Sequence, residues 1–384
     1  MKRLGRLTIL ALLGAAAPAL AQGPALTLKA VNPLDAARSS ETIELSAKDL
    51  APLGEKDLRK IHVVDAAGKE RLCQAVDTDG DLTPDQVIFQ SDFGAKETQT
   101  FKVTVGAKWV YKKEDFRAYG RFNRERFDDY AWENERTAHR MYGKALETWQ
   151  AEPLTSSTVD IWSKRTPHLV LNDWYMVDNY HADTGEGADF YSAGPTRGVG
   201  GNGLWAENKL WLSKNFVGTR TLAAGPIRVL FELTYDAFDV NGNAVGEVKR
   251  IRLDAGQSLN RFESRYSPAK PADLVTAIGL RRVDAVQKEV SPELGRAVIW
   301  EPIKKGAAGH QGIALIVDPK LFQQSVEDEK NLLVIAKAPE RVATYWAGGA
   351  WDKGGLFADF NAWKTYVDAF ARGLGAPIQV SLSQ

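Results

Sequence analysis

The chain is poor in cysteine, because Cys73 is the only one among its 384 residues. An intramolecular disulfide and a cysteine-based zinc site are therefore excluded. A chain of this length can still bury enough apolar surface to fold without cross-links. On the usual prior of ~100–200 residues per domain, the length predicts about two domains.

The sequence also lacks an excess of charge, since 49 Lys and Arg residues are matched by 49 Asp and Glu residues. This balance argues against a nucleic-acid partner but leaves room for a locally basic cleft that binds an acidic sugar polymer. Apart from the N-terminus there is no long apolar run, so no membrane span is expected. The HExxH, Gly-x-Ser-x-Gly, P-loop and dinucleotide-binding motifs are absent, which disfavours zinc proteases, serine hydrolases and nucleotide-dependent enzymes.

The N-terminus predicts export. Three basic residues open the chain, an apolar run follows at 7–13, and Ala19-Leu20-Ala21 matches a signal-peptidase site. We therefore predict that residues 1–21 are a signal peptide cut after Ala21, and that the mature protein is soluble and periplasmic or secreted. The alternative is a buried N-terminal helix.

Short strands separated by turn residues are the main pattern of the chain. Residues 42–46 alternate with period two, and residues 227–235 are a strong strand candidate followed by the hairpin signal Asn241-Gly242. Helix signals are few. This pattern predicts a mainly β protein of antiparallel sheets.

The predicted domains are a small N-terminal β-sandwich over residues 22–107 and a large antiparallel β-supersandwich over residues 108–384. One helix is expected near the C-terminus, where apolar residues from Trp363 to Leu374 recur at spacings of three and four. Residues 377–382 then predict a closing strand.

Alternating carboxylates in the segment DTDGDLTPD form a candidate calcium site at Asp77, Asp79, Asp81 and Asp85. Leu82 stands where calcium loops favour glycine, and the usual glutamate is missing. The alternative is an Asp-rich turn between two strands.

Residues 130–142, YAWENERTAHRMY, mix charged and aromatic side chains as sugar-binding clefts do. If the segment is helical, Glu135 and His139 lie one turn apart. If it is extended, Glu133, Glu135 and His139 share a face. The alternative is an amphipathic surface segment with ion pairs. The candidates for catalysis or substrate binding here are Trp132, Glu133, Asn134, Glu135, Arg136, His139 and Arg140.

Residues 174–205 form a glycine-rich segment with several reactive side chains, and catalytic groups often lie on such loops. Tyr180, His181 and Tyr191 are catalytic candidates, and Arg197 and Trp205 are candidates for substrate binding. A packed, hydrogen-bonded histidine is the alternative for His181. A second glycine-rich loop, YWAGGAWDKGGLF, offers Trp346 and Trp351 as a platform for a sugar ring, or as residues that pack on the C-terminal helix.

Five segments of the mature chain carry a distinctive residue pattern: RFNRERFDDYAWENERTAHRMYG, VDIWSKR, YHADTGEGADFYSAGPTRGVGGNGLW, GPIRVLFELTY and YWAGGAWDKGG. Through these segments the chain resembles the secreted bacterial family catalogued as domain of unknown function 4861. The resemblance covers most of the mature chain. It implies a galactose-mutarotase-like β-supersandwich, a fold shared with sugar epimerases and polysaccharide lyases, and a setting of uronic-acid polysaccharides such as pectin and alginate.

The leading hypothesis is a β-eliminative polysaccharide lyase that acts on uronate-containing poly- or oligosaccharides. Elimination needs a carboxylate neutraliser, a base and an acid. No cofactor is expected beyond a structural calcium ion, and the sequence leaves the oligomeric state open. The candidate roles are neutraliser (Asn134 or Arg136), base (His181), acid (Tyr180 or Tyr191) and holder of a neighbouring uronate (Arg197).

Two alternatives stay open. One is a sugar epimerase or a glycoside hydrolase on the same fold, and a hydrolase would use two carboxylates. The other is a non-catalytic glycan-binding protein that depends on Trp346 or Trp351. The carboxylate candidates are Glu133, Glu135, Glu186 and Asp189.

Overall fold

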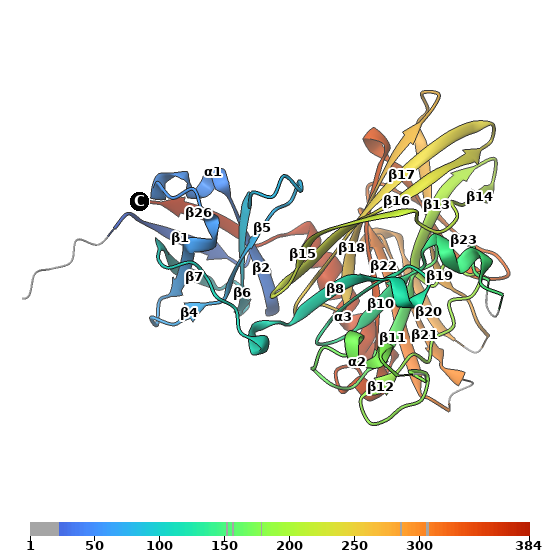
Figure 1. Ribbon diagram of the computed structural model, residues 1–384, viewed down its shortest axis with the longest axis horizontal. Coiled ribbons are helices and arrows are strands. Elements are labelled where there is room, and N and C mark those ends of the chain that lie inside the picture. The colour runs from blue at the N-terminus through green and yellow to red at the C-terminus, as the bar shows by residue number, and fades with distance from the viewer. Residues whose placement is uncertain (1–22, 151–152, 156, 178, 285, 305–306) are drawn as a thin grey trace, which may run out of the picture.

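The computed structural model describes residues 23–150, 153–155, 157–177, 179–284, 286–304 and 307–384. The predicted signal peptide lies outside these residues. Figure 1 shows two β-rich parts, a small one that carries the blue N-terminal strands and a large one that carries the green to orange strands. The prediction of a mainly β protein with a small N-terminal sandwich and a larger antiparallel sandwich is confirmed. No helix in the described ranges is both long and apolar enough to cross a membrane.

The N-terminal part is a sandwich of two antiparallel sheets. Every second residue of the first strand points inward, namely Leu26, Leu28 and Ala30. These residues form the apolar core together with others such as Phe89 and Phe101. One sheet has the order β26-β1-β7-β3-β4 and the other the order β2-β6-β5. The strands are β1 (Ala25–Val31), β2 (Arg38–Ser46), β3 (Ile61–Asp65), β4 (Glu70–Arg71), β5 (Cys73–Val76), β6 (Gln86–Phe93), β7 (Thr98–Val105) and β26 (Gln379–Ser383), and the short helix α1 (Ala47–Leu50) follows β2.

An 8-stranded antiparallel sheet is the centre of the large part, in the order β15-β16-β17-β18-β25-β22-β21-β20. The predicted hairpin is confirmed: Asn241 (φ 51°) and Gly242 (φ 76°) form the turn between β16 and β17, and both φ values are those of a type I′ turn. The strands are β15 (Gly218–Ala224), β16 (Arg228–Val240), β17 (Asn243–Asp254), β18 (Leu259–Pro268), β20 (Gln287–Ser291), β21 (Arg296–Pro302), β22 (His310–Val317) and β25 (Val342–Trp351).

Two 5-stranded sheets pack on this central sheet, in the orders β14-β13-β19-β24-β23 and β12-β11-β10-β9-β8. One apolar core joins all three sheets, through residues such as Trp132 from β9, Ile278 from β19 and Phe231 from β16. The strands are β8 (Ala118–Asn123), β9 (Asp129–Asn134), β10 (Ala138–Met141), β11 (Asp160–Lys164), β12 (Gly187–Ala188), β13 (Val199–Ala206), β14 (Lys209–Trp211), β19 (Leu274–Arg281), β23 (Phe322–Glu327) and β24 (Asn331–Ala338).

The predicted C-terminal helix is α3 (Phe360–Gly375), and Asp359 caps it by accepting a hydrogen bond from Ala362 N (2.9 Å). Its apolar face packs on β21 and β22 through Trp363 and Val367. The following strand, β26, pairs with β1 of the N-terminal sheet. Figure 1 accordingly shows the C-terminus beside the N-terminal sandwich.

Residues 130–142 are extended: β9 and β10 form a hairpin, and His139 pairs with Trp132. The expectation that Glu133 and His139 share a face of one extended segment is wrong. The chain reverses at residues 135–136, and Glu133 pairs with Ala138 instead, so its side chain lies on the opposite face of the sheet from that of His139.

Candidate functional site

A buried ion pair fixes the start of α2 (Leu171–Tyr175), the helix that leads into the glycine-rich segment. Glu133 accepts hydrogen bonds from Lys164 Nζ (2.6 Å), Val170 N (2.9 Å) and Leu171 N (2.7 Å). The side chains of Glu133 and Lys164 are both 0% exposed. Glu133, predicted to bind substrate, therefore holds the backbone of α2 in place.

The glycine-rich segment folds back onto β11. Gly187 has a φ of +104°, and a Cβ there would collide with the carbonyl oxygen of Ser163, so this close approach requires glycine. Further along, Asp189 N donates to the carbonyl oxygen of Tyr180 (3.0 Å). These contacts set the Tyr180-His181 pair over the end of β10.

Arg140 near the end of β10 is the centre of a buried network of carboxylates. Its guanidinium nitrogens lie 2.9 Å from Asp160 Oδ2, 3.1 Å from Asp189 Oδ2 and 3.6 Å from Asp129 Oδ2. Nη1, the nitrogen that faces Asp129, also donates to the hydroxyl of Tyr180 (2.8 Å). Burial raises the pKa of Asp129 to about 8, so one of the three carboxyl groups keeps its proton at neutral pH.

His181 and Tyr180 lie where this network meets solvent. His181 Nδ1 lies 2.9 Å from the carbonyl oxygen of Asp189, which can only accept, so Nδ1 carries a proton and, in the neutral ring, Nε2 is the nitrogen with the lone pair. The His181 side chain is 53% exposed, and its ring centroid is 4.4 Å from that of Tyr180. Burial raises the pKa of Tyr180, so its hydroxyl holds a proton at neutral pH. We call Arg140, Tyr180, His181 and Asp189 the His181 site.

Tyr191, the other predicted acid, is only 5% exposed. The guanidinium carbon of Arg281 lies 4.2 Å from the centroid of its ring, and Arg281 also pairs with Glu301 (3.0 Å). Burial raises the pKa of Tyr191, and it raises the pKa of Glu301 to about 7. Tyr191 is thus a packed residue, and Tyr180 is the tyrosine that reaches solvent.

Two cations that sequence analysis did not find border the His181 site. Lys304 Nζ lies 3.4 Å from the carbonyl oxygen of His181 and 4.7 Å from the ring of Phe190. Arg165 covers Trp351 with its guanidinium carbon 4.8 Å from the ring, and Trp351 is only 3% exposed. Trp351 therefore packs beneath this edge of the site, and the face of its ring is not accessible to a sugar. Both cations lie in loops, where no sequence motif marks them.

Asn134 and Arg136 do not join the His181 site. Arg136 lies in the β9–β10 turn, four residues and therefore ~13 Å from Arg140 along an extended strand. Asn134 ends β9, three residues or ~10 Å beyond Ala131, which pairs with Arg140. Asn134 Oδ1 accepts from Arg136 N (2.9 Å), and Asn134 Nδ2 donates to the carbonyl oxygens of Asp254 (2.8 Å) and Gln257 (2.7 Å). The role of Asn134 is to fix this turn to the β17–β18 turn.

His139 and Trp132 are core residues. Their rings stack with centroids 5.4 Å apart, and both contact Asn260, with distances of 3.1 Å to His139 Nε2 and 2.7 Å to Trp132 Nε1. Burial lowers the pKa of His139 to about 3, so it is neutral at physiological pH. Both side chains are fully buried and do not reach the surface, which corrects the assignments made from sequence.

Arg197 and Trp205 also lie away from the His181 site. Arg197 is 1% exposed, and burial lowers its pKa to about 10. Trp205 on β13 packs with Ala277 and Leu333. Arg197 is too deeply buried to hold a uronate at the surface.

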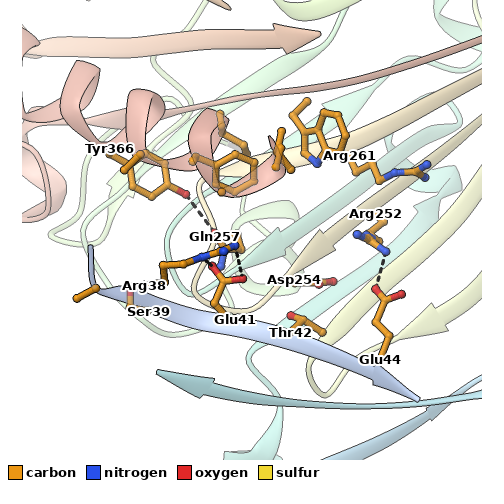
Figure 2. Close-up of a pocket in the computed structure, with 17 residues that line it drawn as sticks. Arg38, Ser39, Glu41, Thr42, Glu44, Arg252, Asp254, Gln257, Arg261 and Tyr366 are labelled. Carbon is orange, nitrogen blue, oxygen red and sulfur yellow. Dashed lines mark hydrogen bonds and ion pairs between the residues drawn. The ribbon is translucent and has the colours of Figure 1, made fainter. Parts of the chain in front are cut away.

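The remaining predicted residues lie near a cavity between the two parts of the molecule. Trp346 lines this cavity together with Tyr366 of α3. Figure 2 shows Tyr366 on the helix side and Glu41 and Glu44 on the opposite side, on β2. Glu135, in the β9–β10 turn, forms an ion pair with Arg117. The residues assigned to one site from the sequence therefore do not form one site: some lie at the His181 site, Trp346 lies at this cavity, and the others are packed in the core or hold turns and α2 in place.

The Asp-rich turn brings together three of its four predicted ligands. Carboxylate oxygens of Asp77, Asp79 and Asp85 lie within 4.8 Å of one another, and Asp81 is outside the group. Asp77 accepts hydrogen bonds from the backbone N–H groups of Gly80 (2.6 Å) and two other residues of the turn. Calcium would compete with these bonds, and the site stays a prediction.

The sheets and their order define a two-part antiparallel β-sandwich protein. The chain belongs to the family described as Domain of unknown function (DUF4861), which matches residues 31–380. It is 29% identical over 365 residues to "Uncharacterized protein P7" of Formosa agariphila, covering 91% of this chain and 92% of that protein.

Two solved structures from Enterococcus faecalis resemble the chain in fold. One is described as a protein in glycosyl hydrolase family 38 (TM-score 0.52, 10% identity, 94% of this chain and 47% of that chain). The other is described as an alpha-mannosidase (TM-score 0.47, 9% identity, 94% of this chain and 46% of that chain). The chain thus spans about half the length of the structures it matches, and the first of these likenesses supports the fold.

Proposed function

We propose that this protein is a carbohydrate-active enzyme, and that it is a lyase which cleaves uronate-containing glycans by β-elimination. The observation that carries the proposal is the pairing of His181 and Tyr180 at the surface, one with a free basic nitrogen and the other with a protonated hydroxyl. The fold shared with a protein in glycosyl hydrolase family 38 agrees with a sugar substrate.

The reaction follows from these two groups. Nε2 of His181 takes the proton from the carbon beside the uronate carboxylate, and a carbon–carbon double bond forms as the bond to the leaving glycosidic oxygen breaks. The hydroxyl of Tyr180 gives its proton to that oxygen. Arg140 Nη1, 2.8 Å from the Tyr180 oxygen, stabilises the phenolate that remains. Lys304 is the bordering cation closest to His181 and is suited to neutralise the substrate carboxylate.

A hydrolase on this site is less well supported, because it needs two carboxyl groups that face the same glycosidic bond. The side chain of Asp189 is 0% exposed and pairs with Arg140, and Glu133 is held by Lys164. Glu135 belongs to the β9–β10 turn. Of the four predicted carboxylates, this leaves Glu186 as a candidate for hydrolysis. None of the other three is placed to act as the second carboxyl group.

The test is to incubate the purified protein with pectin, alginate, ulvan and glucuronan fragments and to follow the ultraviolet absorbance of unsaturated uronates. We expect a rise with one substrate, and a loss of about 10²–10⁴-fold in rate in His181→Ala and in Tyr180→Phe, the usual contribution of an acid or base. His168→Ala, an exposed histidine of the loop before α2, should keep full activity. Shortened chains without the chromophore would instead establish a hydrolase.

A further inference from the structure

The cavity between the two parts of the molecule has a volume of about 240 Å³ and is lined by β2, the β17–β18 region, β25 and α3. We call it the inter-domain cavity. Its size is just below the ~300–1,000 Å³ of pockets that hold drug-sized ligands, so it suits one sugar unit better than a long chain. Side chains on its lining are partly exposed, such as Arg38 (12%) and Arg252 (29%), so the cavity opens to solvent.

The cavity has one aromatic side and one polar side. Trp346, Tyr366 and Phe370 line it from β25 and α3, whereas Glu41 and Thr42 line it from β2. Figure 2 shows this division, with the helix and its rings on one side and the charged side chains of β2 on the other. A sugar ring has the same two characters, an apolar face of C–H groups and an edge of hydroxyl groups.

Strand register places two arginines directly beside each other at this cavity. Arg252 on β17 pairs with Arg261 on β18, and Arg261 pairs in turn with Trp346 on β25. Like charges directly opposite each other in a sheet are destabilising. All three residues line the cavity, so a row of two guanidinium groups and one indole faces it.

The carboxylates near these arginines are shared. Glu44 Oε1 accepts from Arg252 Nη1 (2.8 Å) and also from Arg228 Nη2 (2.7 Å). Glu263 likewise forms ion pairs with both Arg261 (2.8 Å) and Arg265 (2.5 Å). Partial burial lowers the pKa of Arg252, and the charge of Arg228 lowers it further. The charges of Asp254 and Glu44 act in the opposite direction. What an acidic ligand would meet is therefore the adjacent pair of Arg252 and Arg261, and not a cavity with a net positive charge.

We infer that the inter-domain cavity binds a single acidic sugar unit, with its carboxylate at Arg252 and Arg261 and its ring against Trp346. This site is separate from the His181 site, since the two share no residue. The inference does not depend on elimination at His181, because recognition here needs only the charge and shape of the cavity. If the lyase proposal holds, the cavity would hold a uronate of the same glycan or of its product.

The test is calorimetric titration of the full chain with D-galacturonate and D-glucuronate, and with D-galactose, D-glucose and acetate as matched ligands. One of the two uronates should bind at least tenfold more tightly than its neutral counterpart and than acetate. Arg252→Gln and Trp346→Ala should each weaken this binding at least tenfold, with unchanged thermal unfolding. Trp346→Phe should keep most of the uronate affinity. Arg250→Gln is the control, since Arg250 lies on the same strand but does not line the cavity.

Three results would overturn the inference: no uronate binding by the wild-type chain, equal binding of the neutral sugars or acetate, or wild-type affinity in Arg252→Gln. Binding that is lost in His181→Ala but kept in Arg252→Gln would move the ligand to the His181 site. Uronate binding that needs Arg252, in a protein that forms no unsaturated product, would reject the lyase proposal and leave the inference in place.

Discussion

The His181 site and the inter-domain cavity differ in how their charges are matched. At the His181 site one cation, Arg140, pairs with three buried carboxyl groups, those of Asp129, Asp160 and Asp189. Three guanidinium groups and three carboxylates line the inter-domain cavity, and two of the guanidinium groups, those of Arg252 and Arg261, lie side by side. The first place is short of positive charge, whereas the second is balanced in number but brings like charges together.

The two arrangements respond to different partners. Buried carboxyl groups that outnumber their cation take up a proton, and burial raises the pKa of Asp129 to about 8. Arginine does not give up its proton in this way, so the repulsion between adjacent guanidinium groups is relieved by an anion. We therefore expect the His181 site to respond to pH and the inter-domain cavity to respond to ligand.

The largest expected effect is that of Arg140→Gln. Removing the cation breaks the buried ion pairs of Asp160 and Asp189, and breaking a buried pair typically costs about 3–5 kcal/mol of stability. Urea unfolding at pH 7 should show this loss. Adding Asp160→Asn to the variant should restore part of it. An unchanged unfolding midpoint in Arg140→Gln would show that the carboxyl groups do not depend on Arg140.

The second expected effect is a change in the pH dependence of stability in Asp129→Asn. The pKa of Asp129 is raised from 3.8 to about 8, so between these values the folded state holds a proton that the unfolded state has lost. Stability should fall as pH rises through this window, by up to ~1.4 kcal/mol for each pKa unit.

Because asparagine does not ionise, the stability of Asp129→Asn should not fall with rising pH in this window as that of the wild type does. The check is the midpoint of thermal unfolding of both proteins from pH 4 to pH 9. Parallel curves for the two proteins would contradict the assignment of the proton to Asp129.

The smallest expected effect is that of Arg252→Gln on stability without ligand. The substitution removes a partly exposed ion pair with Glu44 but also the repulsion between Arg252 and Arg261, so we expect a change within about 0.5 kcal/mol. Urea unfolding of Arg252→Gln beside Arg140→Gln tests the comparison directly. A large loss in Arg252→Gln would show that the repulsion between Arg252 and Arg261 does not offset the ion pair with Glu44.

Local pattern predicted much of the fold. Period-two alternation over residues 42–46 identified part of β2, residues 227–235 were predicted as the strand that is β16, the pair Asn241-Gly242 marked a hairpin, and apolar spacing identified α3. These features depend on neighbours in the sequence. The pairing of β26 with β1 joins opposite ends of the chain, and no local signal specifies it.

The candidate site was only partly predictable for the same reason. Tyr180 and His181 stood out because they are adjacent in a glycine-rich loop, and Arg140 was named on composition. Asn134 was misjudged because its partners are the backbone carbonyls of a distant turn. Lys304 contacts His181 from a loop that lies 123 residues further along the chain.

The position of β26 also sets an order of events during protein synthesis. The N-terminal strands leave the ribosome first, but β1 lacks its neighbour on one side until residues 379–383 have been made. Until then its backbone N–H and C=O groups are open to pairing with another chain. The N-terminal sandwich, although first in the sequence, is therefore among the last parts of the molecule to be completed.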